Sequence, residues 1–192
     1  MTSVGLGHGA DPEDGADPEA SRRRPPAGLR PRSTRRPTAT VPIVVADLDD
    51  PRVDALVAEH LAEMEPTAPA CSRHALTVEQ FRGTAVRLWV ADDGGPALLG
   101  SVALKDLGDG HLELKTMRVT PAGRGTGLGR RLLLHALDAA RVAGAVRVSL
   151  ETGAGEVFVP ARALYRAHGF VDCAPFGDYR PDPHSTFLTL AL

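Results

Sequence analysis

The residues of this sequence best suited to chemistry form the segment Arg124-Gly-Thr-Gly-Leu-Gly-Arg130. Glycines at alternate positions let a backbone pack closely and turn its N–H groups outward. The helix-like run that follows begins at Leu128, and a helix N-terminus carries partial positive charge. Arg124 and Arg130 add a fixed positive charge on either side. The segment therefore predicts a cradle for a phosphate or diphosphate.

Three ligand classes could present such a diphosphate. A nucleotide triphosphate loop requires Lys and then Ser or Thr after its glycines, and neither follows here. A dinucleotide site requires G-x-G-x-x-G directly after a strand, but Gly129 comes one position early and four residues separate Thr120 from Gly125. Glu151, at the end of the next strand, does imitate the ribose-binding acid of such sites. The third class is coenzyme A.

The composition and charge of the chain limit its possible partners and its cellular location. The chain has 192 residues, 43% of them hydrophobic, with a net charge of −2. That charge predicts no nucleic-acid partner. No apolar run approaches the length of a membrane span, and the N-terminus lacks the apolar core of a secretory signal. Cys71 and Cys173 lie far apart, and we expect free thiols in a cytoplasmic protein without a metal site.

The chain divides near residue 40. Residues 1–40 combine acidic residues, an arginine cluster and recurring Gly and Pro, with three aliphatic side chains larger than alanine. Such a segment buries too little apolar surface to offset its ordering entropy, so we expect a disordered tail. Residues 41–192 form the predicted folded domain.

Within this domain, strand and helix patterns alternate. The predicted strands are 41–46, 87–91, 98–104, 112–119, 146–150, 170–173 and 186–192. The predicted helices begin at Pro51, after a capping box at 77–80, at Leu128 and at Ala161. This order predicts an α/β (α+β) fold with a mixed sheet and a βαβ crossover at the glycine segment.

The glycine segment, after a strand and a proline turn, resembles the diphosphate loop of the GNAT superfamily of N-acetyltransferases. The family pattern R/Q-x-x-G-x-G/A matches Arg124, Gly127 and Gly129. Residues 164–170 (LYRAHGF) resemble the family's LY-x-x-x-GF segment. Glu113-Leu-Lys115, the LETG segment at 150–153 and the Pro-rich residues 175–185 resemble a bacterial small-molecule branch. The resemblance covers about residues 41–192.

This resemblance implies a mostly antiparallel central sheet flanked by helices, with a splayed strand pair that admits acetyl-CoA. It also implies a strand bulge around Met117 and Arg118, and a free main-chain N–H near Val119 that polarises the thioester carbonyl. The expected acetyl-CoA contacts come from the splayed strands, the glycine segment and the LY-x-x-x-GF segment. They are Met117, Arg118, Val119, Arg124, Gly125, Thr126, Gly127, Leu128, Gly129, Arg130, Glu151, Tyr165 and His168.

The resemblance further implies direct acetyl transfer to an amine without a covalent enzyme intermediate. Glu113 stands at the position of a general base, directly or through water; the alternative is a carboxylate paired with Lys115 on the same strand face. His111, also on that face, is a second candidate base. Tyr165 stands where a general acid protonates the leaving thiolate, or where a tyrosine only packs. His168 would contact coenzyme A or cap its helix.

The acceptor pocket is expected between the first helix region and the C-terminal loop. Its candidate residues are His74, Glu113, Phe158, Asp178 and Tyr179, with Glu65 and Cys71 as further candidates. Acidic and aromatic groups would suit a cationic amine. The sequence predicts a small-molecule acetyltransferase, with a non-catalytic acetyl-CoA sensor or a protein N-acetyltransferase as alternatives, and it leaves a homodimer open.

Overall fold

The computed structural model describes residues 40–67 and 76–192, so residues 1–39 of the predicted tail lie outside the described residues. The described helices are α1 (Pro51–Met64), α2 (Val78–Arg82), α3 (Leu128–Val142) and α4 (Val159–Ala167), with 3-10 turns η1 (Glu65–Thr67), η3 (Pro121–Gly123) and η4 (Glu156–Phe158). The strands are β1 (Ile43–Val45), β2 (Val86–Ala91), β3 (Gly100–Asp106), β4 (His111–Val119), β5 (Arg147–Gly153), β6 (Val171–Asp172) and β7 (Ser185–Ala191). No helix in these described ranges is long and apolar enough to cross a membrane.

The seven strands form one sheet in the order β1-β2-β3-β4-β5-β7-β6. All neighbouring pairs are antiparallel except β4 and β5, which α3 connects as a crossover. The predicted mixed, mostly antiparallel sheet is therefore confirmed. Helix α4 begins at Val159, two residues before the predicted start, because Pro160 suits the first turn of a helix.

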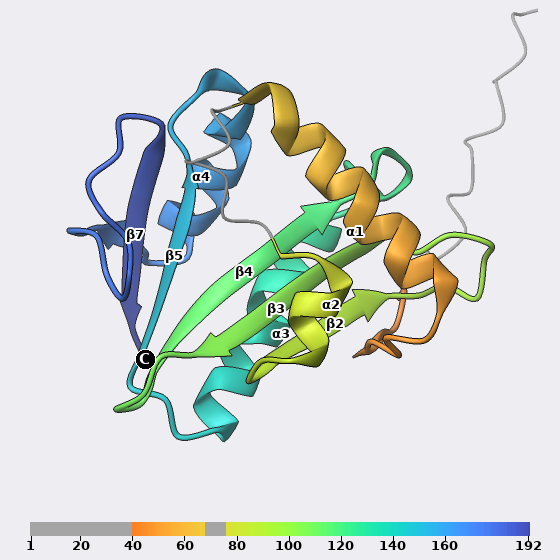
Figure 1. Ribbon diagram of the computed structural model, residues 1–192, viewed down its shortest axis with the longest axis horizontal. Helices are drawn as coiled ribbons and strands as arrows, with labels where there is room; N and C mark the ends of the chain where they lie inside the picture. The colour runs from red at the N-terminus through yellow and green to blue at the C-terminus, as the bar shows by residue number, and fades with distance from the viewer. Residues whose placement is uncertain (1–39, 68–75) are drawn as a thin grey trace, which may run out of the picture. The chain divides into compact units, whose positions relative to one another are not determined.

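Two apolar clusters pack on opposite faces of the sheet. The face of α3 and α4 contains Leu132, Leu133 and Ala136, each fully buried. The other face contains Val53 and Phe81 from α1 and α2. Figure 1 shows α1 and α2 lying across the near face of the sheet, with α3 behind it. Any side chain on the sheet is thus assigned to one of two sides.

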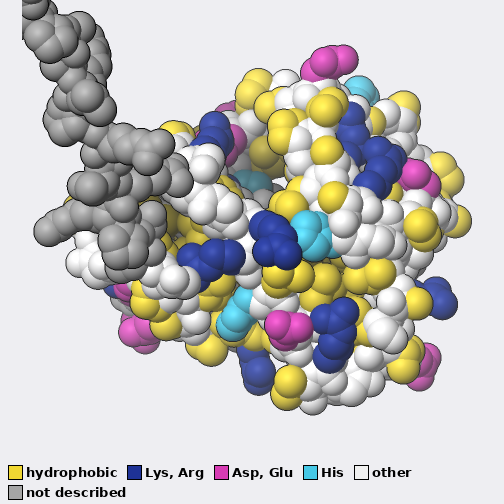
Figure 2. All heavy atoms as spheres, turned by 180° about the vertical axis from the view of Figure 1, so that it is seen from behind, with side chains coloured by type: hydrophobic (Ala, Val, Ile, Leu, Met, Phe, Trp, Pro, Cys, Tyr) yellow, Lys and Arg dark blue, Asp and Glu magenta, His cyan; other side chains and the backbone are white. Residues whose placement is uncertain are grey.

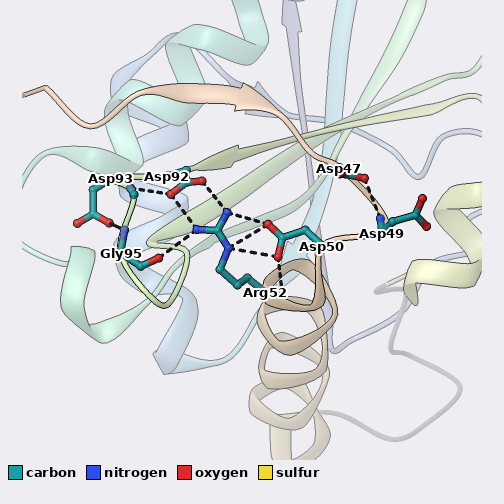
Figure 3. A network of polar contacts seen from close by, with 8 residues as sticks. Asp47, Asp49, Asp50, Arg52, Asp92, Asp93 and Gly95 are labelled. Atoms are coloured by element: carbon teal, nitrogen blue, oxygen red, sulfur yellow. Dashed lines mark hydrogen bonds and ion pairs between the residues drawn. The ribbon is translucent and has the colours of Figure 1, made fainter.

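The start of α1 is fixed by a polar network around Arg52 (Figure 3). Asp50 caps the helix by accepting from the Arg52 N–H at 2.8 Å, and its carboxylate also bonds the Arg52 guanidinium. The same guanidinium bonds the Asp92 carboxylate and the Gly95 carbonyl, beyond the end of β2. Hydrogen bonds from Arg52 lower the pKa of both Asp50 and Asp92. This network ties the N-terminus of α1 to the loop between β2 and β3.

Candidate active site

The sheet opens between β4 and β5. The two parallel strands pair only over His111–Leu114 of β4. Beyond Leu114, β4 continues with β3 alone, while β5 continues to Gly153 with β7 alone. Figure 1 shows the two strands adjoining near the C-terminus and separating toward the top of the view. The splayed strand pair predicted from the sequence is therefore present.

A bulge in β4 lies at this divergence. Ser101 pairs with Arg118 and Ala103 with Lys115, so β4 holds one residue more than β3 over this stretch. Thr116 adopts a φ of 50°, in the left-handed region that non-glycine residues rarely occupy. Its carbonyl accepts from the Ser101 hydroxyl at 2.9 Å. The bulge is thus centred at Thr116 and Met117, one residue before the predicted position.

The pairing of β4 also orients its backbone N–H groups. Thr120 donates its N–H to the Leu99 carbonyl at 3.0 Å, so this N–H points toward the start of β3. Successive N–H groups of an extended strand point to opposite edges. The preceding N–H, that of Val119, therefore points away from β3 and toward the side where pairing with β5 has ended. A carbonyl lodged in the opening would meet this donor.

The glycine segment turns into α3 next to this opening. Gly125 and Gly127 have φ values of 74° and 82°, and Gly127 is the N-cap of α3 without a side-chain hydrogen bond. A Cβ at either glycine would meet nothing within 4 Å, so the backbone is open to a ligand. The first intrahelical bond runs from the Arg131 N–H to the Gly127 carbonyl. The N–H groups of residues 128–130 therefore have no partner within the helix.

Three other residues of this segment pack against the rest of the domain. The Thr126 hydroxyl donates to the Gly123 carbonyl at 2.7 Å, which pins the loop. A Cβ at Gly129 would lie 3.6 Å from side-chain atoms of Leu164 and Val119, so the helix packs closely there. Leu128 is 2% exposed and belongs to the core, which leaves only its backbone for a ligand.

The arginines of the segment differ in their surroundings. The Arg124 side chain is 61% exposed and lies 3.8 Å from Glu63 of α1. Arg130 is exposed, and the structure records no ion pair for it with any described residue. Figure 2, which views the α3 side of the molecule, shows Lys and Arg side chains spread among apolar ones. With the uncapped helix N-terminus and the open glycines, the segment fits a diphosphate.

The side chain of Arg118 is committed to contacts within the protein. Its side chain is 4% exposed and donates to Glu63 at 2.9 and 3.0 Å and to Glu59 at 3.1 Å. Burial alone would lower the pKa of Arg118, but hydrogen bonds and charge attraction from the two glutamates raise it overall. This side chain anchors α1 on the sheet. The predicted acetyl-CoA contact at Arg118 is therefore limited to its backbone.

Glu113 lies on the α1 and α2 side of β4, and its side chain is 2% exposed. Its Oε1 accepts from the Lys115 ammonium at 2.9 Å and from the Tyr179 hydroxyl at 2.5 Å. Lys115 also donates to Tyr179 at 2.9 Å. Burial, with the nearby Glu113 carboxylate, raises the pKa of Tyr179, so this hydroxyl keeps its proton. The expected pairing of Glu113 with Lys115 is present, but in a buried network and not at the surface.

A cavity of about 330 Å³ opens over this network. Glu113, Asp178 and Tyr179, three of the predicted acceptor residues, line it together. Its other lining residues come from α2, β3 and β4, from the residues next to α2 and β3, and from the C-terminal loop: Leu76, Gln80, Lys105, Leu107, Lys115, Phe176 and Gly177. The volume lies at the lower end of the range for ligand pockets, about 300–1,000 Å³.

Tyr165 and His168 lie on the other side of the sheet. Tyr165 is 5% exposed, belongs to the α3 and α4 core, and packs against Phe170 with ring centroids 5.8 Å apart. Burial raises the pKa of its hydroxyl. His168 Nδ1 lies 2.8 Å from the Leu164 carbonyl, which matches the predicted helix-capping interaction.

His111, the second candidate base, contacts the Ser149 hydroxyl at 2.7 Å, and burial lowers the pKa of His111.

The remaining predicted site residues are not brought to the cavity. Glu151 accepts from the Ser185 hydroxyl at 2.6 Å, and so bonds β7. Phe158 does not line the cavity; its ring covers Gly153, where a Cβ would meet the ring at 2.2 Å. His74 and Cys71 lie outside the described residues. Glu65 begins η1, directly after α1.

Sequence reasoning missed several cavity residues. Lys105 stands directly opposite Glu113 on β3, a neighbour that only the strand register reveals. Phe176 packs against both Tyr179 and Phe187, with centroids 5.2 and 6.1 Å apart. The one available signal was composition, because Lys105 and Lys115 are the chain's two lysines.

Comparison with known protein sequences gives three findings. The model of the acetyltransferase (GNAT) family matches residues 53–170. An uncharacterized N-acetyltransferase, YedL, of Escherichia coli (strain K12) is 45% identical over 146 residues, which cover 76% of this chain and 91% of the relative. An IAA acetyltransferase of Azospirillum brasilense is 42% identical over 126 residues, which cover 65% of this chain and 80% of the relative.

A solved structure has the same fold. The crystal structure of an acetyltransferase from Streptococcus agalactiae 2603 superposes with a TM-score of 0.64 at 22% identity. The match covers 80% of this chain and 99% of that chain. At this identity, the likeness concerns the arrangement of the sheet and helices.

Proposed function

The chain belongs to the acetyltransferase (GNAT) family, and we propose that it acetylates the amine of a small molecule that binds in the cavity above Glu113. The single observation that carries the proposal is the position of the buried Glu113 carboxylate. It lies on β4, three residues before the bulge, and lines a cavity together with two further predicted site residues, Asp178 and Tyr179. The IAA acetyltransferase among the relatives supports a small-molecule acceptor.

The residues of the chain fit the donor that the family uses. Acetyl-CoA, when bound, supplies an acetyl group activated as a thioester. The N–H groups at the start of α3, together with Arg130, would hold its diphosphate. Thr116 supports the fit at the opening, since its buried hydroxyl oxygen has no hydrogen-bond partner among the described residues. A ligand in the opening would find a polar group there that the protein leaves unused.

The Val119 N–H would then stabilise negative charge that develops on a carbonyl oxygen in the opening. Backbone donors fixed in this way lower the barrier because they need no reorganisation during the reaction. The splayed strands would hold acetyl-CoA and the cavity would hold the amine, so the two reactants would be oriented toward one another across β4.

Glu113 would accept the proton of the acceptor amine, directly or through a water. Its Oε1 is occupied by Lys115 and Tyr179, so the carboxylate is held in one orientation. Tyr165 would return a proton to the leaving thiolate, because its raised pKa keeps the hydroxyl protonated at neutral pH.

The proposal is tested by thiol release from acetyl-CoA with a panel of small amines, for the purified protein and its Glu113→Gln variant. We expect turnover with a small amine, and a loss of about 100-fold or more in kcat for Glu113→Gln. Asp138→Asn is the matched control, because it makes the same change on an exposed side chain of α3. Turnover only on peptides would favour a protein N-acetyltransferase. Tight acetyl-CoA binding without turnover would favour a sensor.

A further inference from the structure

The chain contains twenty arginines and two lysines, and both lysines line the cavity above Glu113. Lys105 lies on β3 and Lys115 on β4, and both side chains face the α1 and α2 side of the sheet. Lysine differs from arginine in presenting a compact ammonium on a flexible stem. The cavity therefore holds two ammonium groups, which the expected preference for a cationic amine does not explain.

The charges of the cavity separate into a paired and an unpaired set. Lys115 and Glu113 form an ion pair at 2.9 Å and neutralise one another. Lys105 stands opposite Glu113 in the strand register and is half-buried, yet the structure records no hydrogen bond or ion pair for its ammonium within the described ranges. Asp178, at the exposed side of the cavity, likewise has no recorded ion pair there. One cation and one anion are thus left for a ligand.

Gln80, which also lines the cavity, adds a second donor. Its side-chain oxygen accepts from the Thr77 N–H at 2.8 Å, as half of the capping box of α2. This interaction leaves the NH₂ end of the amide as the group that can reach a ligand. A Lys ammonium and an amide NH₂ together are donors that suit a carboxylate.

From this arrangement we propose that the acetyl acceptor is an amino acid, whose carboxylate binds Lys105 and Gln80 while its amine lies toward Glu113. The inference rests on the proposed function and names its substrate class. Lys105 is then the residue that selects an acceptor with a free carboxylate. Leu76, Leu107 and Phe176 supply apolar contacts for the amino-acid side chain.

Matched pairs of acceptors test the proposal, with the full-length protein, acetyl-CoA and the thiol-release assay. Each free amino acid of the twenty is compared with its amide, which keeps the amine and lacks the negative charge, and spermidine serves as a cationic acceptor. We expect at least one free acid to exceed its amide and spermidine in kcat/KM by roughly 10- to 100-fold, the range for a hydrogen bond to a charged group.

Variants assign that preference to Lys105. Lys105→Met should lower kcat/KM for the acid by the same factor and lower it far less for the neutral amide, whereas Lys105→Arg should keep most of the preference. Arg87→Met is the control for net charge, because Arg87 is exposed and its side chain faces the α3 side of the sheet. A Lys105→Met variant that loses activity on acid and amide alike would overturn the inference.

Binding measurements separate this inference from the proposed function. If no acceptor is acetylated, the proposed function fails, but calorimetry of the amino acids and their amides still tests the site. Weaker binding of the acid to Lys105→Met than to the wild type would support the carboxylate site. No binding of any free amino acid to the wild type, or equal binding of acid and amide, would refute it.

Discussion

Arg130→Glu is the perturbation that separates the diphosphate site most cleanly from the stability of the fold. Arg130 is the third residue of α3, is exposed, and has no ion pair recorded among the described residues. A glutamate in the first turn of a helix contributes about 0.3–1 kcal/mol through the helix dipole. The substitution should therefore leave the free energy of unfolding unchanged or slightly raised.

The same substitution should weaken acetyl-CoA binding. It changes the local charge by two units beside the proposed diphosphate. At a separation of about 8 Å and an effective dielectric of about 40, each pair of unit charges interacts by about 1 kcal/mol. Two units then correspond to about 2 kcal/mol, or roughly 30-fold in Kd. Arg130→Gln, which removes one unit, should lose roughly 5-fold on the same arithmetic.

Arg141→Glu is the matched control, since Arg141 lies in the last turn of the same helix. Eleven residues of helix separate the two arginines, which is about 16 Å and exceeds the Debye length at physiological salt. Calorimetry of acetyl-CoA at low and high salt is the assay, and the Arg130→Glu effect should shrink as salt rises. Equal Kd values for Arg130→Glu and Arg141→Glu would refute a diphosphate at the start of α3.

Three other predictions test separate parts of the structure. Tyr165→Phe should lower kcat by about 100-fold or more without changing acetyl-CoA affinity, measured by thiol release and calorimetry; unchanged kcat would reduce Tyr165 to packing. Glu63→Gln should lower the free energy of unfolding at pH 7 by about 1–2 kcal/mol, because buried Arg118 loses a charged partner. Glu59→Gln is the control and should lower it less, because Glu59 is more exposed. The hydrogen bond from Arg118 lowers the pKa of Glu63, so Glu63 stabilises the fold above pH 4.5 and less as the pH falls below it. If denaturant titrations showed the same destabilisation by Glu63→Gln at pH 3 as at pH 7, this interpretation would be wrong. Burial lowers the pKa of His60 from 6.5 to about 4, so the free energy of unfolding of the wild type should fall as the pH drops from 6.5 to 4. Denaturant titrations of His60→Gln should show a smaller fall over this range, and an equal fall would contradict the role of His60.

The parts of the fold that sequence predicted are those fixed by local chemistry. The capping box at Thr77 and Gln80 forms as expected, because both partners lie within one helical turn. The N-terminus of α3 falls at the glycines, since Gly127 takes a φ that other residues avoid. The order of strands and helices along the chain, with the crossover through α3, followed from the alternation of strand and helix patterns.

The parts that sequence could not predict depend on pairing between distant strands. The register that places Lys105 opposite Glu113 joins residues on two strands, and no local pattern encodes it. The ion pairs of Arg118 are not encoded locally either, because its glutamate partners lie on α1, more than fifty residues earlier. The bulge was misplaced by one residue because it is defined by the offset between β3 and β4.

A crystal structure with acetyl-CoA is the most direct measurement of the central claim. We expect the diphosphate to lie on the N–H groups of residues 128–130 and the acetyl carbonyl to lie within hydrogen-bond distance of the Val119 N–H. We also expect the acetyl group to face the cavity that Glu113 lines. A diphosphate bound away from α3, or an acetyl group on the side of the sheet without that cavity, would contradict it.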